Sequence, residues 1–155
     1  MRKYAYFQPP VKQKQVVEEF VNQWKWSRHE EWLVSKWIIG QSIHVCSGSS
    51  KLGDIQLDLT EYAHIRGDAL HLPLKDKSID TVISDPPWNI GFIGRYWKEL
   101  KRVAKKRVIF MGLSKMRDGK DLHLIHSEVV GREYGFQIKA LLVYDRKSQN
   151  ITNYI

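Results

Sequence analysis

Cysteine is nearly absent from this sequence. Cys46 is the single cysteine among the 155 residues, so the chain cannot form an internal disulfide. No window is apolar over the length that a bilayer-spanning helix needs. No apolar segment follows the basic first residues as it does in a signal peptide. Because structural disulfides are typical of oxidising compartments, these absences together predict a soluble, cytoplasmic protein.

Acidic residues are also in deficit. The chain has 17 Asp and Glu residues against 25 Lys and Arg residues, which gives a formal net charge of +8. A basic chain of this kind favours a polyanionic partner, and nucleic acid is the commonest one. A generally basic, solvated surface would give the same count. Charge alone therefore leaves a nucleic-acid partner and a plain basic surface equally open.

The length and the composition are those of one globular domain. A chain of 155 residues is long enough to bury a core, and 43% of its residues are hydrophobic. The sequence contains no internal repeat. We expect a single domain over residues 1–155, in which an N-terminal helical segment (residues 1–40) packs against an α/β core (residues 41–155).

The spacing of apolar residues predicts helices first and strands later. Residues 11–25 are apolar at helical spacing. Ser27 followed by Glu30 is a capping-box pattern that begins a second helix over residues 28–39. Beyond Gly40 the pattern changes to short β-type runs. The expected strands cover residues 42–46, 55–59, 63–68, 79–84, 107–112 and 136–144, and the later helices cover residues 93–105 and 121–131.

Alternation of strands and helices predicts a Rossmann-like α/β fold. Strands joined by helices form a mostly parallel sheet with helices on both faces. In such sheets, ligands bind outside the carboxyl ends of the strands. The loops that follow the strands are therefore where binding and catalytic residues are expected.

The most informative segment is Asp85-Pro86-Pro87-Trp88, which follows the apolar strand predicted over residues 79–84. The prolines stiffen the turn and remove two backbone donors, while the carbonyl groups and the carboxylate remain as acceptors. The tryptophan adds a face on which a flat ring can stack. This combination suits an amino group on a planar ring, because the NH2 can donate to Asp85 and to the Pro86 carbonyl.

Asp85-Pro86-Pro87-Trp88 resembles the catalytic motif of the amino-methyltransferases that modify adenine N6 or cytosine N4 in nucleic acids. The resemblance extends over about residues 42–112. It implies a class I methyltransferase fold, S-adenosylmethionine as cofactor, and catalytic roles for the four residues of the motif.

Three upstream segments are similar to the donor-binding motifs of the same family. They imply contacts to the amino-acid part of S-adenosylmethionine after the first strand, to the ribose after the second and to the adenine after the third. Asp54 competes with Asp58 for the ribose position, and Asp58 is favoured because it ends the apolar run. The loop departs from the family pattern in having one glycine and only a short connection to Asp58. The implied donor-binding residues are Cys46, Ser47, Gly48, Asp58, Asp68 and Ala69.

Several basic residues lie near the predicted catalytic edge. Lys115 and Arg117 follow the strand predicted over residues 107–112, and Arg95 follows Trp88, so we expect these three to contact substrate phosphates. A second basic run is interpreted as a solvated helix face and comprises Lys101, Arg102, Lys105, Lys106 and Arg107.

No metal site is expected. His44 with Cys46, and His123 with His126, are the pairs that suggest one, but neither has further ligands at zinc-site spacing.

The sequence thus predicts a methyltransferase that acts on an exocyclic amino group of a nucleobase in DNA or RNA, with adenine first and cytosine second. The alternatives are guanine in structured RNA, and a non-catalytic nucleic-acid-binding subunit with the same fold. A nicotinamide-dependent oxidoreductase is disfavoured because the loop lacks the G-x-G-x-x-G pattern. No segment is long enough for a separate target-recognition domain, so we expect a homodimer or a specificity partner.

Overall fold

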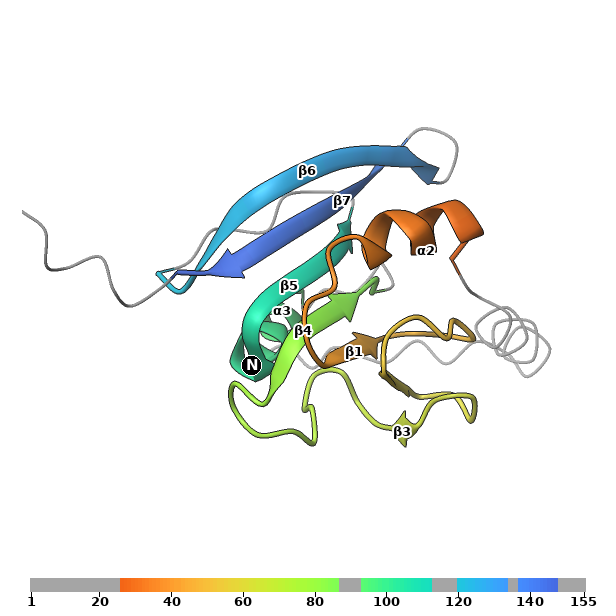
Figure 1. The fold of residues 1–155 in the computed structure, drawn as a ribbon. Helices are drawn as coiled ribbons and strands as arrows, with labels where there is room; N and C mark the ends of the chain where they lie inside the picture. The colour runs from red at the N-terminus through yellow and green to blue at the C-terminus, as the bar shows by residue number, and fades with distance from the viewer. Residues whose placement is uncertain (1–25, 87–92, 113–119, 134–136, 148–155) are drawn as a thin grey trace, which may run out of the picture.

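The computed structural model describes residues 26–86, 93–112, 120–133 and 137–147. These residues form two helices and one sheet (Figure 1). The helices are α2 (Arg28–Ser35) and α3 (Ile93–Val103), and the strands are β1 (Ser42–Val45), β2 (Ile55–Asp58), β3 (Ile65–Arg66), β4 (Ile79–Ser84), β5 (Ala104–Gly112), β6 (Leu122–Glu133) and β7 (Gln137–Arg146).

The seven strands follow the order β3-β2-β1-β4-β5-β7-β6 across the sheet. Neighbours from β3 to β5 are parallel, whereas β7 is antiparallel to both β5 and β6. The predicted Rossmann-like fold with a mostly parallel sheet is confirmed. The carboxyl ends of β1 to β5 meet at one edge of the sheet, which we call the carboxyl edge.

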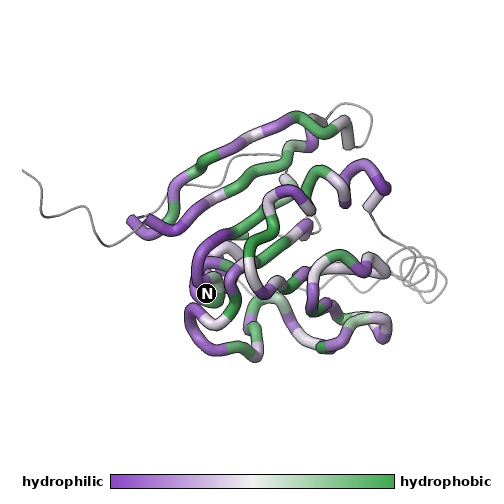
Figure 2. Tube along the Cα trace, in the orientation of Figure 1, coloured by the Kyte–Doolittle hydropathy of each residue, from purple (hydrophilic) through white to green (hydrophobic). Residues whose placement is uncertain are grey.

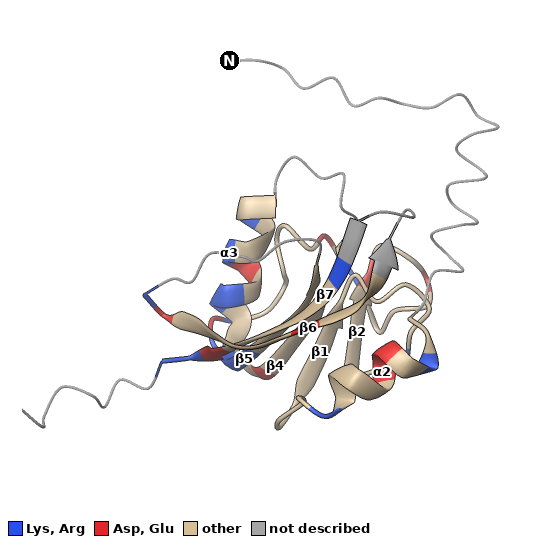
Figure 3. Cartoon of the chain, turned by 90° about the horizontal axis from the view of Figure 1, so that it is seen from above, with Lys and Arg blue, Asp and Glu red and all other residues tan. Residues whose placement is uncertain are grey.

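Both faces of the central strands are buried. In β4, Val82 belongs to the apolar cluster that contains residues of α3, and its neighbour Ile83 belongs to the cluster that contains Leu33 of α2. Successive strand residues point to opposite faces, so strands covered on both sides are apolar almost throughout. Helices α2 and α3 lie on opposite faces of the sheet (Figure 3), and the hydrophobic stretches run through its middle (Figure 2).

Helix α2 begins where the capping box predicts. Ser27 Oγ accepts from the Glu30 backbone N–H at 3.2 Å, and Glu30 Oε2 accepts from the Ser27 backbone N–H at 2.7 Å. The helix predicted over residues 11–25 lies outside the described residues. Among the helices that the structure does describe, none has both the length and the apolar character needed to cross a membrane.

Helix α2 ends at Ser35 and not at residue 39 as the pattern predicts. The chain has to turn into the sheet here, and Gly40 adopts a φ of +61°. A Cβ at this position would lie 2.2 Å from Asp80 Oδ2. The turn after the helix is bonded to β4, because the Ile39 N–H donates to Thr81 Oγ1 at 3.0 Å and the Gln41 N–H donates to Asp80 Oδ2 at 3.1 Å.

The helix predicted over residues 121–131 is wrong, because this segment forms strand β6. It pairs antiparallel with β7, with a register shift between Leu124 and His126. Such a shift interrupts the strict alternation of a strand, which leaves an apolar spacing closer to that of a helix. Pairing with β7 decides the conformation.

Of the predicted basic helix face, Lys101 and Arg102 lie in α3, whereas the other three residues lie in strand β5, so the helix prediction is wrong for Lys105, Lys106 and Arg107. Solvent exposure is wrong as well for Arg107. This residue lies in β5 with 13% of its side chain exposed, and its Nε lies 2.5 Å from Asp145 Oδ1. Its Nη1 also donates to the carbonyl of Trp37 at 2.9 Å. Arg107 therefore joins β5 to β7 and to the turn after α2.

Candidate active site

Four segments that are distant in sequence meet at the carboxyl edge. The parallel arrangement of β3, β2, β1 and β4 places whatever follows each strand at the same edge. The loop after β1 contains Cys46 and Gly48, and β2 ends at Asp58. The segment after β3 contains Asp68, and Asp85 follows β4.

Asp58 fixes the loop after β1. Cys46 and Gly48 have left-handed backbones with φ values of 58° and 54°, so the chain turns sharply on leaving the strand. The Gly48 N–H donates to Asp58 Oδ2 at 2.9 Å, and the Thr60 N–H donates to Asp58 Oδ1 at 3.0 Å. Ser47, within the loop, is fully buried. A carboxylate offers about four acceptor sites, so Asp58 retains acceptor capacity toward a ligand.

Asp54, the competing position, lies at the opposite edge of the sheet. It precedes β2, and its Oδ2 accepts from both the backbone N–H and the Oγ–H of Ser42, each at 2.8 Å. These hydrogen bonds, from the Ser42 backbone first, lower the pKa of Asp54. The geometry places Asp58, and not Asp54, beside the loop that contains Gly48.

Asp68 lies in an exposed turn after β3. Its Oδ1 accepts from the Leu70 N–H at 2.8 Å, and its Oδ2 lies 3.4 Å from His71 Nδ1. The side chain is 56% exposed. Ala69 is partly buried against the core on the α3 face. The carboxylate is thus held in one orientation while it stays accessible.

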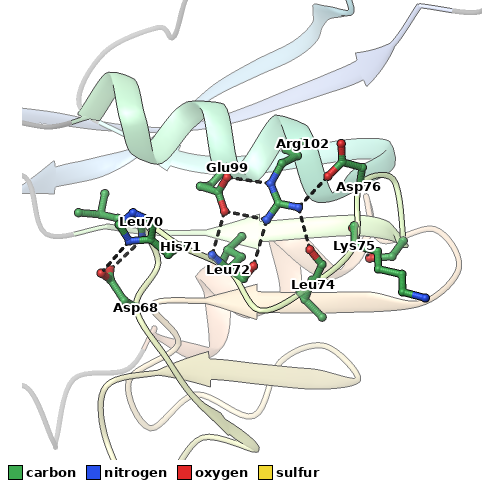
Figure 4. Close-up of polar contacts among 10 residues, drawn as sticks. Asp68, Leu70, His71, Leu72, Leu74, Lys75, Asp76, Glu99 and Arg102 are labelled. Atoms are coloured by element: carbon green, nitrogen blue, oxygen red, sulfur yellow. Dashed lines mark hydrogen bonds and ion pairs between the residues drawn. The ribbon is translucent and has the colours of Figure 1, made fainter.

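Helix α3 anchors the segment that carries Asp68 (Figure 4). Glu99 Oε2 accepts from the Leu72 N–H at 2.8 Å. Arg102 donates to the carbonyl groups of Leu72 at 3.0 Å and Leu74 at 2.7 Å. Arg102 and Glu99 are themselves paired at 2.8 Å. This network fixes the position of the segment relative to the sheet.

The Cys46 thiol is influenced by burial and by three acidic residues of the site. Burial raises the pKa of the Cys46 thiol to about 12, and the negative charges of Asp58, Asp85 and Asp68 contribute in the same direction, against a hydrogen bond from Tyr96. The carboxylates of Asp58, Asp68 and Asp85 are thus all close enough to act on the thiol electrostatically. Since the thiolate is the nucleophilic form, Cys46 is not suited to attack a substrate covalently.

Tyr96, which the sequence pattern missed, lies beneath the site. It is buried at the start of α3. Its hydroxyl is hydrogen-bonded to Ser84 Oγ and donates to Cys46 Sγ at 3.5 Å. Burial raises the pKa of Tyr96 well above its ordinary value. The residue joins the ends of β4 and β1 as a neutral hydroxyl.

Asp85 is buried beneath the start of α2. Its Oδ2 accepts from Trp26 Nε1 at 2.6 Å and lies 3.0 Å from Lys139 Nζ. Lys139 is also 3.0 Å from Glu30 Oε1. Pro86 is buried as well. Nothing in the sequence pattern pointed to the hydrogen bond between Trp26 and Asp85, or to a contact of Lys139 with Asp85 and Glu30.

Of the remaining residues predicted to act on the substrate, the structure describes Arg95. Arg95 is exposed in the first turn of α3, which begins near the carboxyl edge. The remaining predicted residues lie outside the described residues and stay predictions; they are Pro87, Trp88, Lys115 and Arg117.

The histidines suggested as metal ligands lie in other environments. His44 is fully buried with its ring centroid 4.5 Å from that of Trp26, and burial lowers its pKa to about 3. His126 stacks on Trp37 at 4.5 Å. Within the described ranges, no three His, Cys, Asp or Glu side chains are grouped so that they could hold a metal ion.

Comparison with known proteins identifies the fold. No protein-family model matches the sequence, and no curated protein matches it. Solved structures do match. Magnesium protoporphyrin IX methyltransferase from Synechocystis PCC 6803, solved with bound S-adenosylmethionine, is 15% identical over 94% of this chain and 88% of its own, with a TM-score of 0.53. The chain has the class I methyltransferase fold.

Two further structures share this methyltransferase fold. An S-adenosylmethionine-dependent methyltransferase from Thermotoga maritima is 12% identical over 88% of this chain and 97% of its own, with a TM-score of 0.52. The Escherichia coli protein yhhF is 13% identical over 80% of this chain and 89% of its own, with a TM-score of 0.57. The sheet order with an antiparallel β7 is the common feature of class I methyltransferases.

Proposed function

We propose that the protein is an S-adenosylmethionine-dependent methyltransferase that modifies an exocyclic amino group of a nucleobase in DNA or RNA, with adenine as the favoured base. The observation that carries this proposal is the position of Asp85 and Pro86, the described part of the Asp85-Pro86-Pro87-Trp88 segment. The segment follows β4 and begins at the carboxyl edge, beside β1 and its loop. A motif suited to holding an amino group therefore adjoins the edge where this fold binds ligands.

The residues at the carboxyl edge fit the proposed cofactor. S-adenosylmethionine, when bound, supplies a methyl group on a positively charged sulfonium. Asp58 has acceptor capacity for a ribose diol, and Asp68 is exposed for an adenine amino group. Asp85 is paired with Lys139, so Asp58 and Asp68 are the carboxylates of this edge with capacity left for a ligand. Carboxylates of this kind favour a cationic ligand.

The chain's own contribution to the reaction is positioning. The substrate NH2 would donate to Asp85 and to the carbonyl of Pro86, which orients the nitrogen lone pair, while Trp88 stacks on the base. Correct orientation of the two reactants removes a large part of the free-energy barrier to group transfer. Because an amino group is out of reach inside a duplex, the target base has to be flipped or unpaired.

A nucleic-acid substrate is supported by the net charge of +8 and by exposed cations near the site. Arg95 and Lys98 are exposed on the outer side of α3. We propose that Arg95, Lys115 and Arg117 contact substrate phosphates. A homodimer or a specificity partner would extend this surface.

A second candidate is a non-catalytic nucleic-acid-binding subunit. The observation in its favour is that Asp85 already accepts from Trp26 and pairs with Lys139. Catalysis requires that the substrate amino group join or replace these donors. Donor binding distinguishes the two candidates, because a non-catalytic subunit need not bind S-adenosylmethionine.

The direct test incubates the purified protein with methyl-labelled S-adenosylmethionine and DNA, RNA or protein in parallel reactions. The proposal expects label in DNA or RNA and none in protein. Label confined to protein would refute the nucleic-acid assignment. Donor binding without transfer to any acceptor would favour the non-catalytic subunit.

Asp68→Ala is expected to weaken the binding of S-adenosylmethionine about tenfold, the loss of one hydrogen bond to a charged group. Isothermal titration calorimetry measures the effect. Asp121→Ala, at an exposed carboxylate just before β6, is the matched control and should bind as the wild type does. Equal affinities for Asp68→Ala and the wild type would remove Asp68 from the site.

A further inference from the structure

We infer that Lys139 is a positioning residue for Asp85, and that Glu30, Lys139 and Asp85 form a buried charge triad that holds the acceptor carboxylate ionised and in one orientation. The inference deepens the proposed function and rests on it for the role of Asp85. Neither Lys139 nor Glu30 belongs to the Asp-Pro-Pro-Trp segment. Lys139 lies in β7, which β5 separates from β4 in the sheet, and Glu30 lies in helix α2.

Strand geometry explains how Lys139 reaches Asp85. In β7, Leu141 and Val143 belong to the apolar cluster on the α2 face, so Lys139, with the same parity, points to that face. Its neighbour Ala140 pairs with Gly112, the last residue of β5. Lys139 therefore lies at the carboxyl edge, and its side chain extends past the end of β5 to the residue that follows β4.

Two members of the triad, Lys139 and Asp85, are almost completely shielded from water, and Glu30 is partly buried. The side chains of Lys139 and Asp85 are 7% and 3% exposed, and that of Glu30 is 18% exposed. Burial alone lowers the pKa of a lysine, yet the charges and hydrogen bonds of Asp85 and Glu30 outweigh it and raise the pKa of Lys139. For Glu30, burial is likewise outweighed by hydrogen bonds from Ser27 and Lys139, and the pKa is lowered. Lys139 and Glu30 are therefore charged in the folded protein, and Lys139 Nζ lies at ion-pair distance, 3.0 Å, from Asp85 Oδ2.

Stability gives little reason for such an arrangement. Removing ions from water is costly, and apolar residues of similar size often replace a buried ion pair without loss of stability. The surroundings are apolar already, since Leu141 and Ile109 lie in the cluster on this face. The triad instead has a consequence for the carboxylate: Trp26 and Lys139 both act on Oδ2, which fixes its plane.

The ionisation of Asp85 depends on the groups that face it. On the α2 face these are Lys139 and Glu30. On the α3 side the Cys46 thiol and the Tyr96 phenol interact with it electrostatically, and burial raises the pKa of both, so they stay neutral. Lys139 is thus a cation in direct contact with the Asp85 carboxylate, with Nζ 3.0 Å from Oδ2. Without it, a carboxylate buried to this degree would take up a proton at a higher pH.

The test uses the Trp26 indole N–H as a reporter of the Asp85 charge, and needs neither donor nor substrate. Its NMR signal is assigned with Trp26→Phe and followed from about pH 5 to pH 8. In the wild type the signal should not titrate in this range. In Lys139→Met it should titrate within this range, and Lys139→Arg should restore the flat profile.

Lys106→Met is the matched control. Lys106 and Asp80 form a pair of the same length, 3.0 Å, at the start of β4 and β5, and removing it should leave the Trp26 signal unchanged. Lys139→Gln gives the same comparison should Lys139→Met fail to fold. A Trp26 signal that stays flat in both folded Lys139 variants would overturn the inference.

Methyl transfer separates this inference from the proposed function. Lys139→Met should lower kcat at least about tenfold, leave the KM for S-adenosylmethionine unchanged, and move the acidic limb of the pH profile upward. If the wild type transfers no methyl group, the proposed function fails, whereas the indole titration still decides whether Lys139 controls Asp85. An unshifted pH profile in an active, folded Lys139→Met protein would contradict the positioning role.

Discussion

Asp85→Ala is expected to lower kcat for methyl transfer by roughly 1,000-fold, the loss seen when one preorganised polar group is removed from an active site. The substrate amino group would lose the acceptor that orients its nitrogen toward the methyl donor. S-adenosylmethionine itself does not need this carboxylate for its ribose or adenine, so its affinity should stay within a few-fold of the wild-type value. Steady-state kinetics and calorimetry measure the two quantities.

Asp80→Ala is the control for this prediction. Asp80 lies in β4, the strand that Asp85 follows, but at the opposite end of this strand, where it pairs with Lys106. Its loss should leave kcat unchanged in the folded protein. Turnover of Asp85→Ala close to the wild-type rate would show that the roles are assigned wrongly.

Asp58→Ala is expected to weaken S-adenosylmethionine binding roughly 100-fold. Two effects combine, each of the size of a charge-assisted hydrogen bond. The variant loses the proposed acceptor for the ribose hydroxyls. It also loses the 2.9 Å hydrogen bond from the Gly48 N–H to Asp58 Oδ2, which holds Gly48 in its left-handed turn. Calorimetric titration of the variant with S-adenosylmethionine measures the loss.

Asp54→Ala separates a local effect from a general one. Asp54 also accepts two hydrogen bonds, both from Ser42 of strand β1, but at the edge of the sheet opposite the carboxyl edge. We expect this variant to lose stability and to keep its donor affinity once folded. Similar affinities for Asp58→Ala and Asp54→Ala would mean that neither carboxylate touches the donor.

The sequence predicts most of the sheet, because buried parallel strands are short apolar runs that end in polar loops. Residues 79–84 show this in β4, whose predicted and observed bounds agree. The pattern predicts a helix where β6 lies, because the register shift between Leu124 and His126 hides the alternation of the strand and only pairing with β7 reveals it. Helix α2 is shorter than predicted, and the turn that follows it is bonded to β4 through Thr81 and Asp80, which are distant in sequence.

The candidate site was predictable only in part. Asp58, Asp68 and Asp85 each follow a strand, so their meeting at one edge follows from the order of elements. Trp26 and Lys139 reach Asp85 from 59 and 54 positions away along the chain, as the residue numbers give. No local pattern encodes such contacts, because they depend on how α2 packs on the sheet and on the place of β7 beside β5.

The central claim is that the methyl group goes to an exocyclic amino nitrogen. Its most direct measurement is mass spectrometry of the nucleosides released from DNA or RNA after reaction with the wild-type protein. The account predicts an amino-methylated nucleoside, first of all the nucleoside whose base is N6-methyladenine. A methyl group on a ring carbon or on a ribose hydroxyl would contradict it, because neither acceptor uses the hydrogen bonds that Asp85 and the Pro86 carbonyl are proposed to accept.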